Sequence, residues 1–124
     1  MHEFSNQRPL YIQLREIIEE AILNDVLKSD EAIPSIRVMS KDYHLNPITV
    51  TNAIDDLVEG GILYKKRGIG MFVSGDAKNK IRSQQFDGFK SHEMVAALEK
   101  AKLLGISRQE IEAIVNRVYG GQND

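Results

Sequence analysis

Residues 33–73, IPSIRVMSKDYHLNPITVTNAIDDLVEGGILYKKRGIGMFV, decide the fold. They predict a helix, a tight turn, a second helix opened by Asn46-Pro47, and a short basic hairpin. This order is that of a winged helix-turn-helix, whose second helix is shaped to enter the major groove of DNA. We therefore expect a mainly α fold with a small β-hairpin.

Local signals mark the ends of the two helices in this stretch. Ser35 can cap a helix that runs to about Tyr43. Asn46 is a strong cap for the next helix, Pro47 suits its first position, and Gly60-Gly61 ends it. The side chains expected to face inward are Ile36, Val38 and Met39 in the first helix, and Val50, Ala53, Ile54 and Leu57 in the second.

The flanking sequence predicts one helix before this stretch and two after it. Pro9 to about Asn24 has apolar residues three and four apart, and Ile33 can form a very short strand. The hairpin strands are expected at 62–66 and 71–74, and the polar residues 75–86 are expected to be a linker. Two helices should follow, at 91–104 and at 107–119, with a capping box at Ser107 and Glu110 and an end at Gly120-Gly121. We expect a DNA-binding domain at 1–76, and a linker with a two-helix dimerisation tail at 77–124.

Composition narrows the class of protein. Hydrophobic residues make up 42% and charged residues 27%, which is ordinary for a globular protein. No apolar run approaches the roughly 18 residues of a membrane span, and residues 1–10 lack the apolar core of a signal peptide. The absence of Cys excludes disulfides and thiolate metal sites. We expect a cytoplasmic protein without a membrane partner.

The charge balance argues mildly against DNA binding. Residues 1–78 contain 9 Lys/Arg against 12 Asp/Glu, a balance of −3, and residues 79–124 contain 7 against 6, a balance of +1. The distribution matters more than the sum, because many acidic residues lie on or just after the first helix. The basic residues lie where a winged helix meets phosphate, namely Arg37, Lys41, Lys65, Lys66 and Arg67.

The first turns of the second helix carry polar side chains that can read bases. Asn can pair with adenine, and Thr can bond a base edge or pack its methyl group on thymine. The alternative is local, because Asn46 can cap the helix and Thr49 can bond its backbone. We favour the cap for Asn46 and a DNA-facing role for Thr49, Thr51 and Asn52.

Two further segments can hold phosphate. The backbone and hydroxyl of Ser35, with Arg37, can grip one phosphate at the entry to the first helix of the pair, although they can equally be a capped helix with a solvated Arg. Lys66, Arg67 and Gly68 form a basic turn that can enter a narrow minor groove or remain solvated.

Five short motifs follow one another through residues 9–73. They are Pro9-Leu10-Tyr11-Ile12-Gln13, Ile33-Pro34-Ser35-Ile36-Arg37, Asn46-Pro47-Ile48-Thr49-Val50, Gly60-Gly61-Ile62-Leu63 and Arg67-Gly68-Ile69-Gly70-Met71-Phe72-Val73. Their order and spacing resemble the GntR family of bacterial transcription regulators. The short tail, and Pro47 where many relatives have Arg, resemble the YtrA subfamily. The resemblance implies a repressor that binds inverted repeats as a dimer, with DNA contacts at Ser35, Arg37, Thr49, Thr51, Arg67 and Gly68.

Two positions depart from the pattern of that family. Relatives usually have a glycine in the turn where this chain has Ser29-Asp30-Glu31-Ala32, and many have a basic residue in place of Thr51. The second departure, together with Pro47, removes positive charge from the reading helix.

The tail carries an apolar stripe on each of its two helices, and two such short helices bury little surface by themselves. They can fold back on the winged helix or pack against a second chain; we favour a homodimer, since half-site readers work in pairs. The tail is too small for a large ligand cavity, so a small-molecule effector would have to bind at a dimer or domain interface. The stripes consist of Met94, Val95, Leu98, Ala101 and Leu104, and of Ile111, Ile114, Val115 and Val118.

Nothing in the sequence favours catalysis. His2, His44 and His92 are widely separated and fit no metal-binding spacing, and no nucleophile elbow or phosphate-cradling loop is present. We therefore expect no enzyme activity, metal or cofactor. The expected function is sequence-specific binding of double-stranded DNA in transcription regulation. The alternative, which the negative charge of residues 1–78 supports, is a winged-helix module that binds protein and not DNA.

Overall fold

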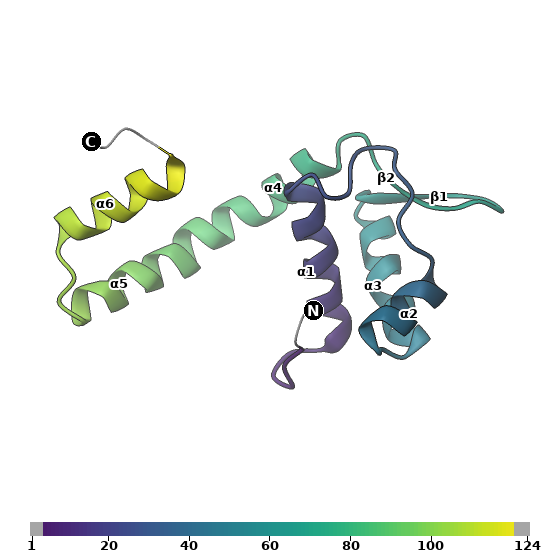
Figure 1. Cartoon of the computed structure of the whole chain (residues 1–124), viewed down its shortest axis with the longest axis horizontal. Coiled ribbons are helices and arrows are strands. Elements are labelled where there is room, and N and C mark those ends of the chain that lie inside the picture. Colours follow the sequence, from purple (N-terminus) through teal and green to yellow (C-terminus); the bar gives the residue numbers. More distant parts are fainter. Residues whose placement is uncertain (1–3, 121–124) are drawn as a thin grey trace. The chain divides into compact units, whose positions relative to one another are not determined.

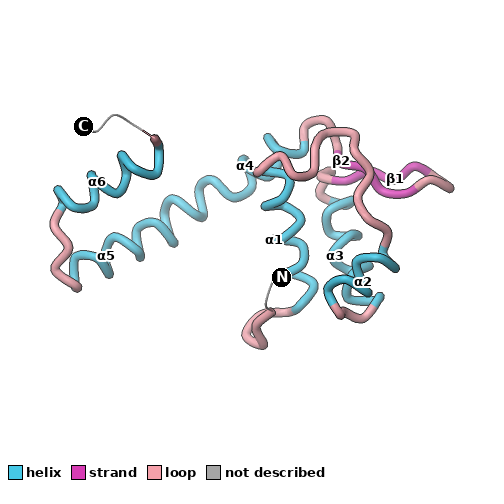
Figure 2. Tube along the Cα trace, in the orientation of Figure 1, coloured by secondary structure: helices cyan, strands magenta, loops and turns pink. Residues whose placement is uncertain are grey.

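The computed structural model describes residues 4–120, and Figures 1 and 2 show the helices and strands along the chain. The predicted fold class is confirmed: the described residues are mainly helical, with one two-stranded antiparallel sheet. They divide into two compact units, with the division between Gln84 and Gln85. His2 and Gly121 lie outside the described residues. No described helix is long and apolar enough to cross a bilayer.

The first unit has a helical core that supports a small hairpin. Helices α1 (Leu10–Leu23), α2 (Ile36–Tyr43) and α3 (Pro47–Glu59) come before strands β1 (Leu63–Lys66) and β2 (Gly70–Val73). The predicted inward face of α3 is confirmed, because all four of its residues are at most 1% exposed. These α3 side chains pack in one apolar cluster that also includes Leu14, Ile18, Ile22, Met39, Ile62, Leu63 and Val73.

Val38 was expected inside but is 45% exposed. The buried side of α2 consists of Met39, with Ile36 and Tyr43 packed beside it at spacings of three and four residues. Since successive residues turn by about 100° around a helix, Val38 lies off this side.

In the hairpin, the residue pairs across the two strands run from Leu63 and Val73 to Lys66 and Gly70. Gly68 and Gly70 have φ angles of 76° and 145°, values that favour glycine, so both residues suit this turn. Residues 30–33 lie along the other edge of β2, where Ala32 forms a bridge with Phe72. The short strand expected at Ile33 is thus a single bridge one residue earlier.

The expected linker at 75–86 is wrong, because helix α4 covers Ala77–Gly88. Ala77 and Ile81 are at most 1% exposed in the core of the first unit, so tertiary packing stabilises a segment with little helical periodicity of its own. Lys80 adds an ion pair with Asp76 at 3.5 Å. The division between the units therefore lies within α4 and not before it.

The second unit continues from α4 into a π-helical turn, η1 (Phe89–Met94), and then α5 (Val95–Leu103) and α6 (Arg108–Tyr119). The hydroxyl of Ser91 donates to the carbonyl of Asp87 at 2.7 Å, a bond that competes with the normal helical pattern. The helix expected at 91–104 therefore corresponds to the second part of η1 followed by α5. The predicted capping box at the start of α6 is confirmed, with Ser107 and Glu110 each accepting from the other's backbone N–H.

Candidate nucleic-acid interface

The α2–α3 pair is held by side-chain caps on both helices. The Ser35 hydroxyl accepts from the N–H of Val38 at 3.1 Å, and Asn46 Oδ1 accepts from the N–H of Ile48 at 2.8 Å. Both predicted caps are confirmed. His44, in the left-handed conformation with a φ of 57°, ends α2 and turns the chain toward α3. The turn therefore fixes the angle between the two helices.

The outward side of α3 changes character along the helix. Ile48, Asn52, Asp55 and Glu59 follow one another at spacings of three and four residues, and all are exposed. The first half of this stripe is uncharged, whereas the second half is acidic. The first half can approach DNA, while Asp55 and Glu59 would be repelled by phosphate.

The hairpin is fixed at its base and open at its tip. The Tyr64 ring stacks on Phe72 with centroids 5.7 Å apart, and the Lys66 ammonium lies 4.6 Å above the Phe72 ring. The Tyr64 hydroxyl donates to Asp30 at 2.8 Å, and this bond raises the pKa of Tyr64. Beyond this stacked base, Arg67, Gly68 and Ile69 are exposed.

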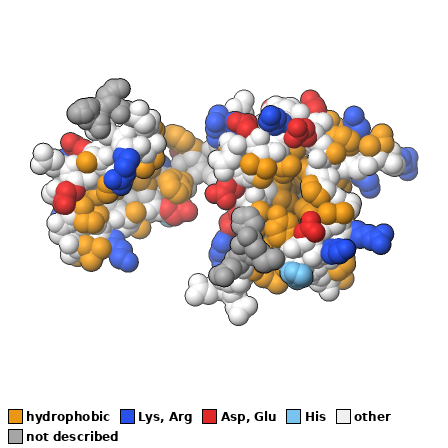
Figure 3. All heavy atoms as spheres, viewed as in Figure 1, with side chains coloured by type: hydrophobic (Ala, Val, Ile, Leu, Met, Phe, Trp, Pro, Cys, Tyr) orange, Lys and Arg blue, Asp and Glu red, His pale blue; other side chains and the backbone are white. Residues whose placement is uncertain are grey.

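Basic side chains of the first unit lie exposed around α3. Arg37 and Lys41 on α2, with Lys65 and Arg67 on the hairpin, form no ion pair within residues 4–120. Figure 3 shows Lys and Arg side chains beside α2 and at the outer end of the hairpin. These charges are free to meet an anion.

Many acidic side chains of the first unit are bound by neighbours elsewhere. Asp56 contacts Arg15 at 3.1 Å, and Asp25 contacts Lys78 at 2.8 Å. The hydrogen bond from Lys78, together with its charge, lowers the pKa of Asp25. The net charge of −3 for residues 1–78 therefore says little about the local charge beside α2 and the hairpin.

The structure brings the predicted DNA contacts onto three adjoining elements. Ser35, Arg37, Asn46, Asn52, Lys66, Arg67 and Gly68 are exposed, and Thr49 and Thr51 are half-buried. Two apolar side chains that were not predicted as contacts, Ile48 and Ile69, are also 69% and 72% exposed. Ile48 could have been noticed in the sequence, because it is an apolar residue that lies off the inward face of α3. Such side chains can pack on thymine methyl groups or against a groove wall.

The comparisons with known proteins agree with this arrangement. The model of the family described as bacterial regulatory proteins, gntR family, matches residues 10–73. The chain belongs to this family. The match covers α1, α2, α3 and the hairpin, which carry all the residues of the candidate interface.

Relatives extend the similarity beyond that domain. The uncharacterized HTH-type transcriptional regulator YhcF of Bacillus subtilis is 25% identical over 97% of this chain and 98% of its own length. The HTH-type transcriptional repressor YtrA of the same species is 32% identical, over 59% of this chain and only 56% of YtrA. Both relatives are named as HTH-type transcription factors, YhcF as a regulator and YtrA as a repressor.

Solved structures share the fold. A GntR family transcriptional regulator from Listeria monocytogenes has a TM-score of 0.71 and 25% identity, over 92% of this chain and 98% of its own. The DNA-binding domain of AraR, in complex with operator ORX1, has a TM-score of 0.54 and 31% identity, over 60% of this chain and 90% of that domain. The described part of this GntR-family chain holds no group of three or more metal-binding side chains.

The tail residues expected at a dimer interface differ in exposure. Ala101 is only 9% exposed and Ile111 is half-buried, so both are already covered within the chain. Phe86 and Phe89, which lie in or beside the expected linker, are 59% and 51% exposed. The expected residues that remain 41–73% exposed are Met94, Val95, Leu98, Leu104, Ile114, Val115 and Val118.

Proposed function

We propose that this GntR-family protein is a cytoplasmic, YtrA-like repressor that binds an inverted-repeat operator as a homodimer. The observation that carries the proposal is the exposed, uncharged first half of α3, flanked by the unpaired cations of α2 and the hairpin. An uncharged reading surface between cations suits a major groove bordered by phosphates.

The proposed contacts divide by chemistry. Ser35, the N-terminal N–H groups of α2 and the Arg37 guanidinium bind phosphate. Thr49, Thr51 and Asn52, together with Ile48, face base edges. The primary role of Asn46 is to cap α3. Lys66, Arg67 and Gly68 at the hairpin enter the adjoining minor groove.

The homodimer is supported by the exposed apolar side chains of the second unit. Seven residues of the two predicted stripes are at least 41% exposed, which is unusual for apolar side chains clustered on two short helices. A second copy that covers them by two-fold symmetry would hold two reading helices at a fixed separation. A fixed separation requires an operator with two inverted half-sites.

Selection of bound sequences from random double-stranded DNA tests the proposal. We expect enrichment of an inverted repeat whose half-sites lie about one helical turn apart. Electrophoretic shifts with the selected DNA and with a shuffled control, at two salt concentrations, separate specific from non-specific binding. Failure to enrich any sequence, with only salt-sensitive binding of all DNA, would contradict the proposal.

A reporter gene placed behind the selected operator tests repression. Expression of the protein should lower reporter output, and Arg37→Ala should restore it. A rise in output on expression would show activation and overturn the proposed repression, while leaving the proposed DNA binding intact.

A further inference from the structure

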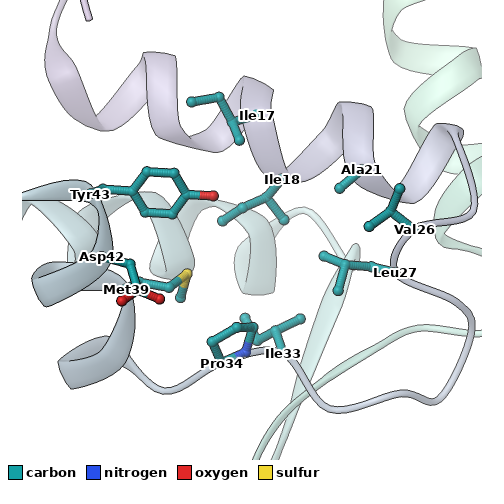
Figure 4. Close-up of a pocket in the computed structure, with 10 residues that line it drawn as sticks. All are labelled: Ile17, Ile18, Ala21, Val26, Leu27, Ile33, Pro34, Met39, Asp42 and Tyr43. Carbon is teal, nitrogen blue, oxygen red and sulfur yellow. The ribbon is translucent and has the colours of Figure 1, made fainter. Parts of the chain in front are cut away.

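A hollow of about 410 Å3 opens inside the first unit, between α1, α2 and the loop that joins them (Figure 4). Its volume falls within the roughly 300–1,000 Å3 of small-molecule sites. It lies within the DNA-binding unit, and not at the interface where an effector was expected. Figure 3 shows hydrophobic side chains gathered on the face between α1 and α2. The lining residues are Ile17, Ile18, Ala21, Val26, Leu27, Ile33, Pro34, Met39, Asp42 and Tyr43.

The lining combines an apolar body with one negative charge. Asp42 supplies the only charged side chain of the lining, and it is exposed and forms no ion pair within residues 4–120. The Tyr43 ring reaches from α2 toward Ile17 and Ile18 on α1 (Figure 4). A lining that contains both an aromatic ring and a carboxylate favours a cation, and the aliphatic walls favour an apolar group attached to it.

The position of the hollow connects it to the candidate interface. Ile33 and Pro34 line it and come directly before Ser35, the cap of α2. Ile33 also donates its N–H to Met71 in β2 of the hairpin, at 2.9 Å. A molecule between α1 and α2 would therefore contact the Ile33-Pro34 segment, which leads into α2 and is hydrogen-bonded to β2 of the hairpin.

We propose that this hollow binds a small hydrophobic organic cation, which shifts α2 against α1 and thereby changes the affinity for the operator. The regulatory part of this inference rests on the proposed function, whereas binding of the cation does not. The cation acts only to the extent that it binds the free and the DNA-bound arrangements of α2 differently.

Binding is tested without DNA, using benzyltrimethylammonium and its neutral isostere neopentylbenzene as probes. Chemical shifts of backbone amides should move for residues around the hollow, and the cation should bind more tightly than the isostere. Asp42→Asn should weaken binding of the cation by about threefold, as expected of a partly exposed charge pair, and leave the affinity for the isostere unchanged. Glu20→Gln, an exposed carboxylate of α1 outside the lining, is the matched control and should change neither.

Filling the hollow is the second test. Ala21→Phe should abolish binding of both probes, and Val26→Trp, at a position that is 70% exposed, should do so with less risk to the fold. Shifts that persist in both folded variants would place the probes elsewhere and overturn the site. If the wild type is a dimer and either variant is a monomer, a second copy of the chain occupies the hollow, and the cation site would be overturned.

Operator affinity with and without benzyltrimethylammonium tests the regulatory step. We expect a change of at least threefold in the wild type and none in Val26→Trp. Binding of the cation with unchanged operator affinity would overturn the regulation and leave the proposed function intact. Absence of operator binding without any probe would instead contradict the proposed function alone.

Discussion

Arg15 on α1 forms an ion pair with Asp56 on α3, with Nη1 3.1 Å from Oδ2. The guanidinium also lies near Glu19, whose side chain is 8% exposed, with Nε 3.9 Å from Oε2. Two carboxylates thus share one cation at the junction of α1 and α3. This contact joins the first helix of the chain to the proposed reading helix. It also pairs the charge of Asp56, so that this carboxylate repels DNA phosphate less.

Removing Asp56 should therefore destabilise the first unit. We expect Asp56→Ala to lower the free energy of unfolding by about 0.5–1 kcal/mol. The pair is only partly exposed, and without it Arg15 keeps only its longer contact with Glu19. Asp55→Ala is the matched control, since Asp55 is exposed and unpaired within the described residues. Urea denaturation measures these changes, and the single variants Arg15→Ala and Asp56→Ala with their double variant give the coupling energy; a coupling near zero would contradict the prediction.

Arg37 should contribute affinity and little selectivity. Since a phosphate contact carries no base information, Arg37→Ala should weaken binding to all operator variants similarly and reduce the salt slope by about one. Arg82→Ala, an exposed cation of α4, should have a much smaller effect. Titrations at several salt concentrations test this. A changed base preference with an unchanged slope would make Arg37 a base reader.

Asn52 and Thr51 should contribute selectivity. Asn52→Ala or Thr51→Ala should relax discrimination at one or two base pairs per half-site, each worth on the order of 1–3 kcal/mol. Asn79→Ala, which removes an exposed amide from α4, is the control. The measurement is binding to a panel of single mismatches. Profiles that match the parent would place both side chains away from the bases.

Local signals explain what the sequence could predict. The ends of α3 were predictable because Asn46-Pro47 and Gly60-Gly61 are adjacent residues whose effects need no tertiary structure. Its inward face followed from helical spacing, and the GntR family followed from motifs within one domain.

Contacts between distant residues explain the rest. Helix α4 was missed because its first turns are stabilised by burial of Ala77 and Ile81 and by the Lys78–Asp25 pair, whose members are 53 residues apart. The Tyr64–Asp30 bond at the hairpin joins residues 34 apart. The hollow between α1 and α2 likewise exists only once the two helices pack together. No periodicity encodes such pairings.

The capping box of α6 should make the tail sensitive to acid. The N–H and the hydroxyl of Ser107 lower the pKa of Glu110 below its ordinary value of 4.5. The resulting stability is therefore fully present above pH 4.5 and is lost as the pH falls through the lower folded-state pKa. Amide exchange in α6 should accelerate in that range, and Glu110→Gln should abolish this dependence, whereas Glu112→Gln should preserve it. Equal behaviour of the two variants would contradict the prediction.

Leu98 should hold the proposed dimer together. It is 46% exposed on α5, and a charge placed in a covered interface there would be buried without a partner, at a cost of several kcal/mol. Leu98→Glu should therefore sediment as a monomer. Leu103→Glu, the same change at a residue of α5 that lies outside the predicted apolar stripe, should leave the dimer intact.

The Leu98→Glu monomer should also lose cooperative DNA binding. The winged helix should remain folded, because its core of α1, α3 and the hairpin draws on residues of the first unit alone. Its affinity for a full inverted repeat should then fall to that for a single half-site, since two linked readers gain from their effective concentration. A wild-type chain that is monomeric at micromolar concentration, or a Leu98→Glu chain that unfolds outright, would mean that these side chains pack within one chain, and the two-fold reading of the operator would fail with it.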